Sequence, residues 1–217
     1  VMEVAHDGHT YRVNLPLIGA YQAANALVSA GLAMASGMTA ARALDALSRL
    51  QPVRGRLERA GLNREGAPAY IDYAHTPDAL DAAIAALRPH AQGRLIVVFG
   101  AGGDRDPGKR PAMGAIAARD ADVAIVTDDN PRGEDPGEIR AAILAGMENP
   151  RAQVLEIGDR RAAIEKAMGM AGRHDIVLIA GKGHEQGQIL GRGDAMRVLP
   201  FDDVAVAREF AGLGGQE

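Results

Sequence analysis

The sequence of 217 residues contains no cysteine, which excludes disulfides, thiolate metal ligands and a cysteine nucleophile. Tryptophan is also absent, and aromatic residues make up only 3% of the chain. A hydrophobic core must therefore be built from Ala, Val, Ile, Leu and Met. An excess of positive charge is missing too, because the formal net charge is −4. This balance argues against nucleic acid or an anionic membrane surface as a partner.

Long apolar runs are lacking as well. No segment reaches the length of a membrane span, and the N-terminus has no charged-then-apolar secretory pattern. We therefore expect a cytoplasmic protein with no membrane partner. We also expect a monomer. Hydrophobic residues make up 47% of the chain and charged residues 24%, which is the usual balance of a globular protein.

The first 52 residues predict two strands around a turn at Asp7-Gly8 and then two helices. An Ala-rich segment predicts a helix over 19–36 that stops at Gly37, and Thr39 is expected to be the N-cap of a second helix ending at Leu50. These elements cannot bury a good core alone, so residues 1–52 look like the end of a domain. Pro, Gly and charged residues cluster at 51–56, which places a boundary there.

Strands and helices alternate in the remainder, residues 53–217. The predicted strands are 69–73, 94–99, 122–127, 153–157 and 175–180, and the predicted helices are 77–88, 111–119, 136–147 and 159–171. Several of these strands are continuously apolar, as expected when helices cover both faces of a sheet. The pattern therefore predicts an α/β fold with a mainly parallel, Rossmann-like sheet. A last strand at 196–201 and a closing helix at 202–210 complete it.

The most informative motif is Asp129-Asn130-Pro131-Arg132, which follows the apolar run 122–126. Ligands of such sheets gather at the carboxyl ends of the strands. A carboxylate, an amide and a guanidinium at this place suit a small molecule that carries both an amine and a carboxylate. The motif thus predicts amino-acid recognition.

A second motif, Gly181-Lys182-Gly183-His184-Glu185, follows another buried strand and should lie on the same rim. Its glycines allow close backbone approach, and Glu185 offers a carboxylate for an ammonium group. His184 has the chemistry of a catalytic base, but a packing or hydrogen-bonding role is favoured.

Residues 103–110 imitate a phosphate-binding loop, but Arg110 stands where a hydroxyl should hold Mg²⁺. Asp104 and Asp106 would also repel a phosphate. A Gly-rich turn that brings the backbone and Arg105 to an anionic ligand is favoured, with a plain surface turn as the alternative.

Residues 72–77 end the first predicted strand of the second domain. Asp72 and His75 are suited to a ribose and a base, although a capped helix start at Thr76 explains the segment equally well. Arg56 suits either a phosphate contact or a surface ion pair.

Taken in order, these motifs resemble the Mur ligases of peptidoglycan assembly, and among them the members that add meso-diaminopimelate. The resemblance rests on Gly19 with residues 25–27, 55–58, 72–77, 102–111, 129–132 and 181–185. It implies that diaminopimelate is bound by Arg105, Asp129, Asn130, Pro131, Arg132, Gly181 and Glu185. It further implies that ATP is contacted by Asn25, Arg56, Asp72 and His75. No catalytic residue or metal ligand is assigned within this chain.

The chemistry of the ligand agrees with this assignment. The distal end of diaminopimelate bears an ammonium and a carboxylate, and a guanidinium can hold the carboxylate through two parallel hydrogen bonds. Lysine lacks the distal carboxylate, so Arg132 would stay unpaired at a cost of roughly 1–3 kcal/mol or more.

The resemblance also shows what this sequence lacks: the family's UDP-binding domain, its Gly-Lys-Thr phosphate loop, its Mg²⁺ carboxylate and its modified lysine. We therefore expect residues 1–52 to be the end of the ATP-binding central domain and 53–217 the C-terminal domain, in a fragment that is inactive alone. The implied reaction joins diaminopimelate to UDP-MurNAc-L-Ala-D-Glu with ATP and Mg²⁺. The alternatives are a folylpolyglutamate synthetase-like or murein-recycling ligase, or a non-catalytic Rossmann-like binding module.

Overall fold

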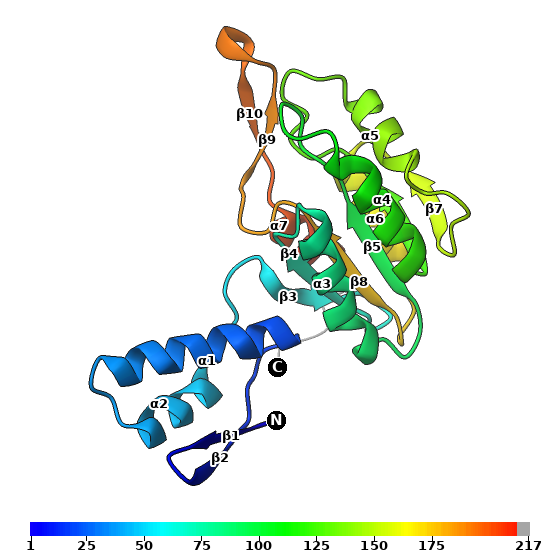
Figure 1. Cartoon of the computed structure of the whole chain (residues 1–217). Helices are drawn as coiled ribbons and strands as arrows, with labels where there is room; N and C mark the ends of the chain where they lie inside the picture. Colours follow the sequence, from blue (N-terminus) through cyan, green and yellow to red (C-terminus); the bar gives the residue numbers. More distant parts are fainter. Residues whose placement is uncertain (212–217) are drawn as a thin grey trace. The chain divides into compact units, whose positions relative to one another are not determined.

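The computed structural model describes residues 1–211. The chain, drawn in Figure 1, divides into two compact units, Val1–Val53 and Arg54–Glu217. Each unit has its own hydrophobic core. None of the helices within residues 1–211 has the length and apolar character needed to cross a membrane.

The first unit pairs a hairpin with two helices. Strands β1 (Met2–His6) and β2 (His9–Val13) are antiparallel, and helices α1 (Ala20–Ala35) and α2 (Ala40–Ala46) are followed by the 3-10 turn η1 (Leu47–Arg49). Gly37 ends α1 with a φ of 99°, as predicted. Thr39 is the N-cap residue of α2, as predicted, although its side chain makes no capping hydrogen bond.

The second unit is built on a six-stranded sheet with the order β3-β4-β8-β5-β6-β7. Only β3 runs antiparallel to its neighbour, and the other five strands are parallel. The mainly parallel Rossmann-like sheet predicted from the sequence is thus confirmed. The strands are β3 (Arg56–Leu62), β4 (Pro68–Asp72), β5 (Leu95–Phe99), β6 (Val123–Val126), β7 (Gln153–Glu156) and β8 (Ile176–Ala180).

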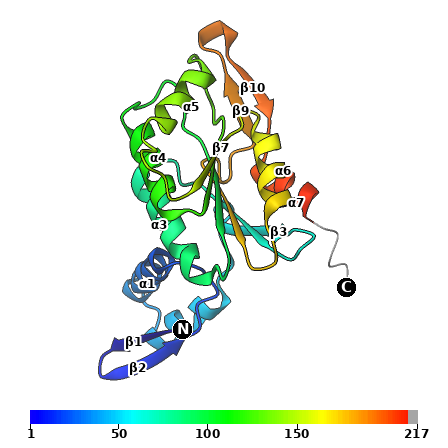
Figure 2. The same cartoon turned by 90° about the vertical axis from the view of Figure 1, so that its right-hand side faces the viewer.

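Helices cover both faces of this sheet, as Figure 2 shows. On one face lie α3 (Pro77–Leu87), α4 (Lys109–Asp120) and α5 (Pro136–Leu144), and on the other α6 (Arg160–Met170) and α7 (Asp203–Phe210). Ile96 and Val98 of β5 pack in the core cluster that also contains α6 and α7 residues. The whole strand is buried, which explains its continuous apolar sequence. A 3-10 turn, η2 (Arg88–His90), follows α3.

Two strands were missed in the sequence. Strand β3 carries charged residues and a glycine and contains register shifts against β4, so it lacks clean alternation. Strand β9 (Gly187–Leu190) is only four residues long and pairs with β10 (Arg197–Pro200) around the 3-10 turn η3 (Gly193–Ala195). The predicted last strand therefore exists, but it belongs to a separate hairpin and not to the main sheet.

Candidate functional site

The loops that follow the parallel strands meet around one cleft. Its volume is about 430 Å³, and it lies at the carboxyl ends of β4, β5, β6 and β8, the expected place for a ligand of an open α/β sheet. The cleft is lined by Tyr73, His75, Thr76, Pro77, Gly102, Arg105, Asp106, Lys109, Asp129, Asn130, Arg132, Gly181 and Glu185. Six of the seven residues predicted to bind an amino acid are among them. Pro131 is buried beside the cleft.

Residues 129–132 are held by the hairpin that the sequence analysis missed. The backbone N–H of Arg132 donates to the carbonyl of Ile189 at 3.0 Å, and Gly191 N–H donates to the carbonyl of Arg132 at 2.7 Å. Asn130 and Arg132 both have left-handed φ angles, 46° and 52°, which are uncommon for residues other than glycine. The segment is thus fixed by β9 in a conformation that turns its side chains into the cleft.

Glycine allows the neighbouring loops to touch this segment directly. The backbone N–H of Gly103 donates to the carbonyl of Asn130 at 3.0 Å. A Cβ added at Gly103 would lie 1.8 Å from the carbonyl oxygen of Pro131, far inside van der Waals contact. Residue 103 must therefore be glycine because two backbones pass at contact distance here, and the predicted approach of this turn to an anionic ligand stays a prediction.

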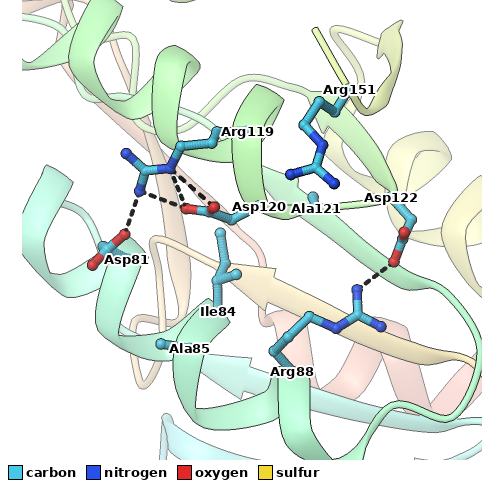
Figure 3. Close-up of a pocket in the computed structure, with 9 residues that line it drawn as sticks. All are labelled: Asp81, Ile84, Ala85, Arg88, Arg119, Asp120, Ala121, Asp122 and Arg151. Atoms are coloured by element: carbon cyan, nitrogen blue, oxygen red, sulfur yellow. Dashed lines mark hydrogen bonds and ion pairs between the residues drawn. The ribbon is translucent and has the colours of Figure 1, made fainter.

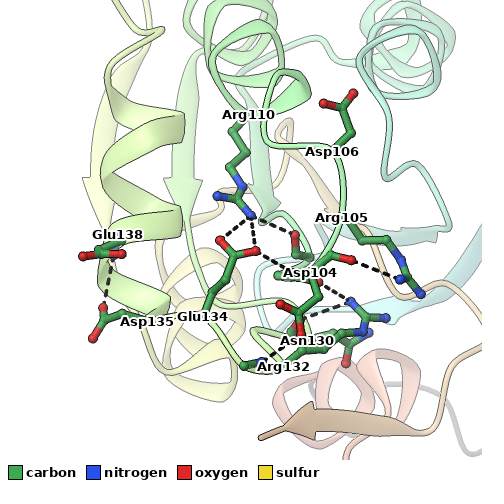
Figure 4. Close-up of polar contacts among 12 residues, drawn as sticks. Asp104, Arg105, Asp106, Arg110, Asn130, Arg132, Glu134, Asp135 and Glu138 are labelled. Atoms are coloured by element: carbon green, nitrogen blue, oxygen red, sulfur yellow. Dashed lines mark hydrogen bonds and ion pairs between the residues drawn. The ribbon is translucent and has the colours of Figure 1, made fainter. Parts of the chain in front are cut away.

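Ion pairs and a backbone hydrogen bond fasten the turn at residues 103–110 to neighbouring segments (Figure 4). Arg110 is buried and donates to Glu134 Oε2 at 2.8 Å, and the backbone N–H of Asp104 donates to Glu134 Oε1 at 2.5 Å. The carboxylate of Asp104 pairs with Arg192 of the hairpin, and this partner lowers the pKa of Asp104. These contacts favour a turn fastened to the protein over an open phosphate loop, in line with the sequence argument.

Asn130 and Glu185 form the polar centre of the cleft. The Asn130 side-chain amide donates to Glu185 Oε2 at 2.7 Å, and the Tyr73 hydroxyl donates to Glu185 Oε1 at 3.4 Å. Partial burial, and then the charge of Glu185, raise the pKa of Tyr73. The hydroxyl of Tyr73 therefore stays protonated and remains a donor to this carboxylate.

The cations of the cleft have no carboxylate partner among residues 1–211. Arg132 uses only Nη1, which donates to the carbonyls of Gly103 at 3.1 Å and Asn130 at 3.3 Å. Lys109 donates to the carbonyl of His75 at 2.9 Å, and burial lowers its pKa. Arg105 is exposed and bonds a backbone carbonyl.

Glu185 likewise forms no salt bridge with any residue in the described part of the chain. An uncompensated guanidinium and an uncompensated carboxylate in one cleft are complementary to a ligand that carries both an ammonium and a carboxylate. These two groups are compatible with the zwitterionic ligand predicted from the sequence, which stays a prediction.

The Tyr73 ring forms a second surface beside this centre. The guanidinium carbon of Arg56 lies 5.0 Å from the ring centroid, and the rings of His75 and His184 lie at 4.6 Å and 5.0 Å. His75 also contacts the carbonyl of Tyr73 through Nδ1 at 2.8 Å. A cation and three rings suit a base or a phosphate group.

Asp72 organises the backbone around that surface. Its buried carboxylate accepts the N–H of Leu57 at 2.8 Å and of Ala74 at 2.9 Å. Thr76 caps α3 by accepting the N–H of Ala79, with Pro77 in the first turn, so the capped helix start is confirmed. Asn25 lies exposed on α1 in the first unit.

A larger cavity of about 690 Å³ occurs elsewhere, near the amino end of β6 (Figure 3). Its arginines are largely neutralised by the protein itself: Arg88 pairs with Asp122, and Arg119 pairs with Asp81 and Asp120. Because this cavity lies at the opposite strand ends and lacks uncompensated carboxylates, the smaller cleft is the better candidate.

A metal centre is not apparent in the described part of the chain, since residues 1–211 contain no group of three or more His, Cys, Asp or Glu side chains placed to hold an ion. The Mg²⁺ implied by the resemblance therefore has no visible ligand set among these residues.

Two residues that line the cleft, Tyr73 and Lys109, and the buried Lys182 of the 181–185 loop were not predicted from the sequence. Tyr73 and Lys182 lie inside recognised motifs that indicate no role for either residue, and Lys109 lies in the segment that imitates a phosphate-binding loop. The spacing of a motif shows which strand end carries a side chain. It does not show which groups from other loops surround that side chain.

Comparison with known proteins gives a consistent result. Residues 55–183 match the family model described as Mur ligase, glutamate ligase domain. The chain is 63% identical, over 93% of its length, to UDP-N-acetylmuramoyl-L-alanyl-D-glutamate–2,6-diaminopimelate ligase of Zymomonas mobilis. It is 56% identical, again over 93% of its length, to the protein of the same name from Caulobacter vibrioides.

A solved structure of a ligase of that name superposes with a TM-score of 0.67 and 36% identity, over 95% of this chain and 41% of the other. The chain spans only 41% and 40% of the lengths of the two curated relatives.

Proposed function

The chain belongs to the Mur ligase family, and from this premise we propose that it is the C-terminal part of a MurE-type ligase that adds meso-diaminopimelate to UDP-MurNAc-L-Ala-D-Glu. The observation that carries the proposal is the pair of uncompensated groups in the cleft, the guanidinium of Arg132 and the carboxylate of Glu185. The distal carboxylate of diaminopimelate binds Arg132 and Arg105, and the distal ammonium binds Glu185.

In the proposed reaction the γ-carboxylate of the D-glutamate residue receives the terminal phosphate of ATP, and ADP leaves. The free amine of diaminopimelate then attacks this acyl phosphate, phosphate leaves and an amide bond forms. Residues of this chain contribute by orientation. By holding the distal end of the amino acid, they aim the attacking amine at the carbonyl carbon, which removes much of the entropic cost of the encounter.

The surface around Tyr73 is proposed to face the nucleotide. Arg56 offers a guanidinium and His75 a ring beside the Tyr73 ring, while Asp72 keeps the backbone of this surface in place. Asn25 is assigned to ATP on the resemblance alone. Mg²⁺ accompanies ATP and is held by parts of the enzyme outside the described residues. We propose the cytoplasm as the place of the reaction, as expected from the sequence, and the predicted monomeric state remains a prediction.

Isothermal calorimetry on the purified chain tests the amino-acid site. We expect binding of meso-diaminopimelate and far weaker binding of lysine. Arg132→Ala should weaken diaminopimelate binding about 10- to 100-fold, since a hydrogen bond to a charged group contributes about 1.5–3 kcal/mol. The same variant should leave the affinity for lysine unchanged, because lysine has no distal carboxylate.

Arg151→Ala is the matched control. Arg151 lines the larger cavity of Figure 3, so its removal should affect neither ligand. Equal affinity of the wild-type chain for lysine and diaminopimelate would contradict the proposal. Preference for glutamate would favour a folylpolyglutamate synthetase-like ligase, and binding of no amino acid would favour the non-catalytic module.

A further inference from the structure

Lys182 is completely buried at the centre of the cleft loops, with 0% of its side chain exposed. Burying an ammonium group is costly unless each of its N–H donors finds an acceptor. Here three oxygens surround Nζ: Asn130 Oδ1 at 2.9 Å, the carbonyl of Gly187 at 2.8 Å and Asp129 Oδ1 at 3.2 Å. Lys182 thus joins residues 129–130 to the first residue of β9, and no step of the proposed reaction uses it.

The first consequence concerns the orientation of Asn130. Its Oδ1 accepts from Lys182 Nζ and from the backbone N–H of Ile189, each at 2.9 Å. With two donors at the oxygen, the amide nitrogen must point the other way, toward Glu185 Oε2. Asn130 therefore presents donors, and not an acceptor, to the carboxylate of the cleft.

The second consequence concerns Asp129. Its Oδ1 is buried and forms an ion pair with Lys182, although the angle of this contact does not make it a hydrogen bond. The negative charge of Asp129 is therefore compensated inside the protein. Burial lowers the pKa of Lys182, and the charge of Asp129 opposes that effect. Glu185 forms no such ion pair with a described residue, and the charge of Arg160 acts on it only from a longer distance.

We propose, on the basis of the function proposed above, that Lys182 is a positioning residue that sets the selectivity of the cleft. By occupying Asp129 and Asn130 Oδ1, it leaves Glu185 as the acceptor for the ligand's ammonium and Arg132 as the partner of its carboxylate. Without Lys182 the cleft gains an uncompensated carboxylate. Such a site attracts any amino acid with a cationic side chain, lysine included, and depends less on the distal carboxylate.

Lys182→Met tests this inference, since methionine has a similar length and no charge. We expect the ratio of the dissociation constants for lysine and meso-diaminopimelate to fall about tenfold or more, measured by calorimetry. Lys166→Met, the same change at an exposed position of α6, should leave the ratio unchanged. A purely structural role would lower the fraction of competent protein without changing the ratio, so an unchanged ratio overturns the inference.

The double variant Lys182→Met/Asp129→Asn keeps the test decisive if the single variant does not fold. It removes both charges with little change of shape, and we expect it to retain the preference for diaminopimelate. Loss of that preference would mean that Asp129 itself receives the ammonium, and the inference would fail. Absence of any preference in the wild-type chain is a separate result, which contradicts the proposed function before a variant is measured.

Discussion

Gly181 stands where the end of β8 meets the candidate site, and its surroundings tolerate no side chain. Its φ is 122°, outside the range of L-residues, and an added Cβ would lie 2.3 Å from Asp129 Oδ2. We predict that Gly181→Ala lowers the free energy of unfolding by about 1–3 kcal/mol through backbone strain. It should also weaken diaminopimelate binding, because Asp129 must move. Urea unfolding and calorimetry measure the two effects.

Gly169 in the last turn of α6 provides the matched control. An added Cβ there meets nothing within 4 Å. Gly169→Ala should therefore stabilise the protein by about 0.5–1 kcal/mol by restricting the unfolded chain, and binding should not change. If Gly181→Ala were as harmless as Gly169→Ala, the close packing of the Gly181 loop against Asp129 would be wrong.

The position of a single side chain can be predicted from the sequence when the residue directly follows a buried strand. Asn130, Arg132 and Glu185 were predicted to lie at one edge of the sheet because each follows a buried parallel strand. The burial of Lys182 could not be predicted, because lysine is almost always exposed. Only the assembled loops supply its three oxygen partners.

Helices α6 and α7 are joined by a buried ion pair that also reaches the sheet. Arg160 bonds both carboxylate oxygens of Asp203, at 2.8 and 2.7 Å, and the carbonyl of Ala180 at 2.9 Å. Burial disfavours the charge of Arg160, but Asp203 more than offsets it and the pKa of Arg160 is raised. We predict that Arg160→Met costs about 3–5 kcal/mol of stability in urea unfolding, since Asp203 is left buried and unpaired.

The chain offers an exposed pair on the same two helices as a control. Arg161 and Glu209 pair with about half of each side chain exposed, so Arg161→Met should cost no more than about 1 kcal/mol. In Arg160→Met/Asp203→Leu the loss should be smaller than in Arg160→Met alone, because no buried charge remains. Equal losses for Arg160→Met and Arg161→Met would show that burial of the pair does not matter.

The long elements of the second unit could be predicted from the sequence because each has a strong signal. Strand β5 is apolar throughout, and α3 starts at Thr76-Pro77. Strands β3 and β9 escaped because their stability comes from pairing. The first lies at the sheet edge with two register shifts, and the second is set by Arg132 and β10. Contacts between distant segments leave no local pattern.

At the scale of the whole molecule, the two units differ in how much they bury. Strands β5 and β8 are fully buried, whereas α1 leaves Val28 and Leu32 more than 60% exposed. We therefore predict that the free energy of the opening that exposes the amide hydrogens of α1 is at least about 2 kcal/mol lower than that for β5 and β8.

Diaminopimelate at 100 times its dissociation constant should raise the free energy of opening of β5 and β8 by about 2.7 kcal/mol and leave that of α1 unchanged. Hydrogen exchange followed by mass spectrometry measures both. An equal rise in α1 would mean that the units unfold together, because a ligand of the second unit can protect the first only if one opening exposes both.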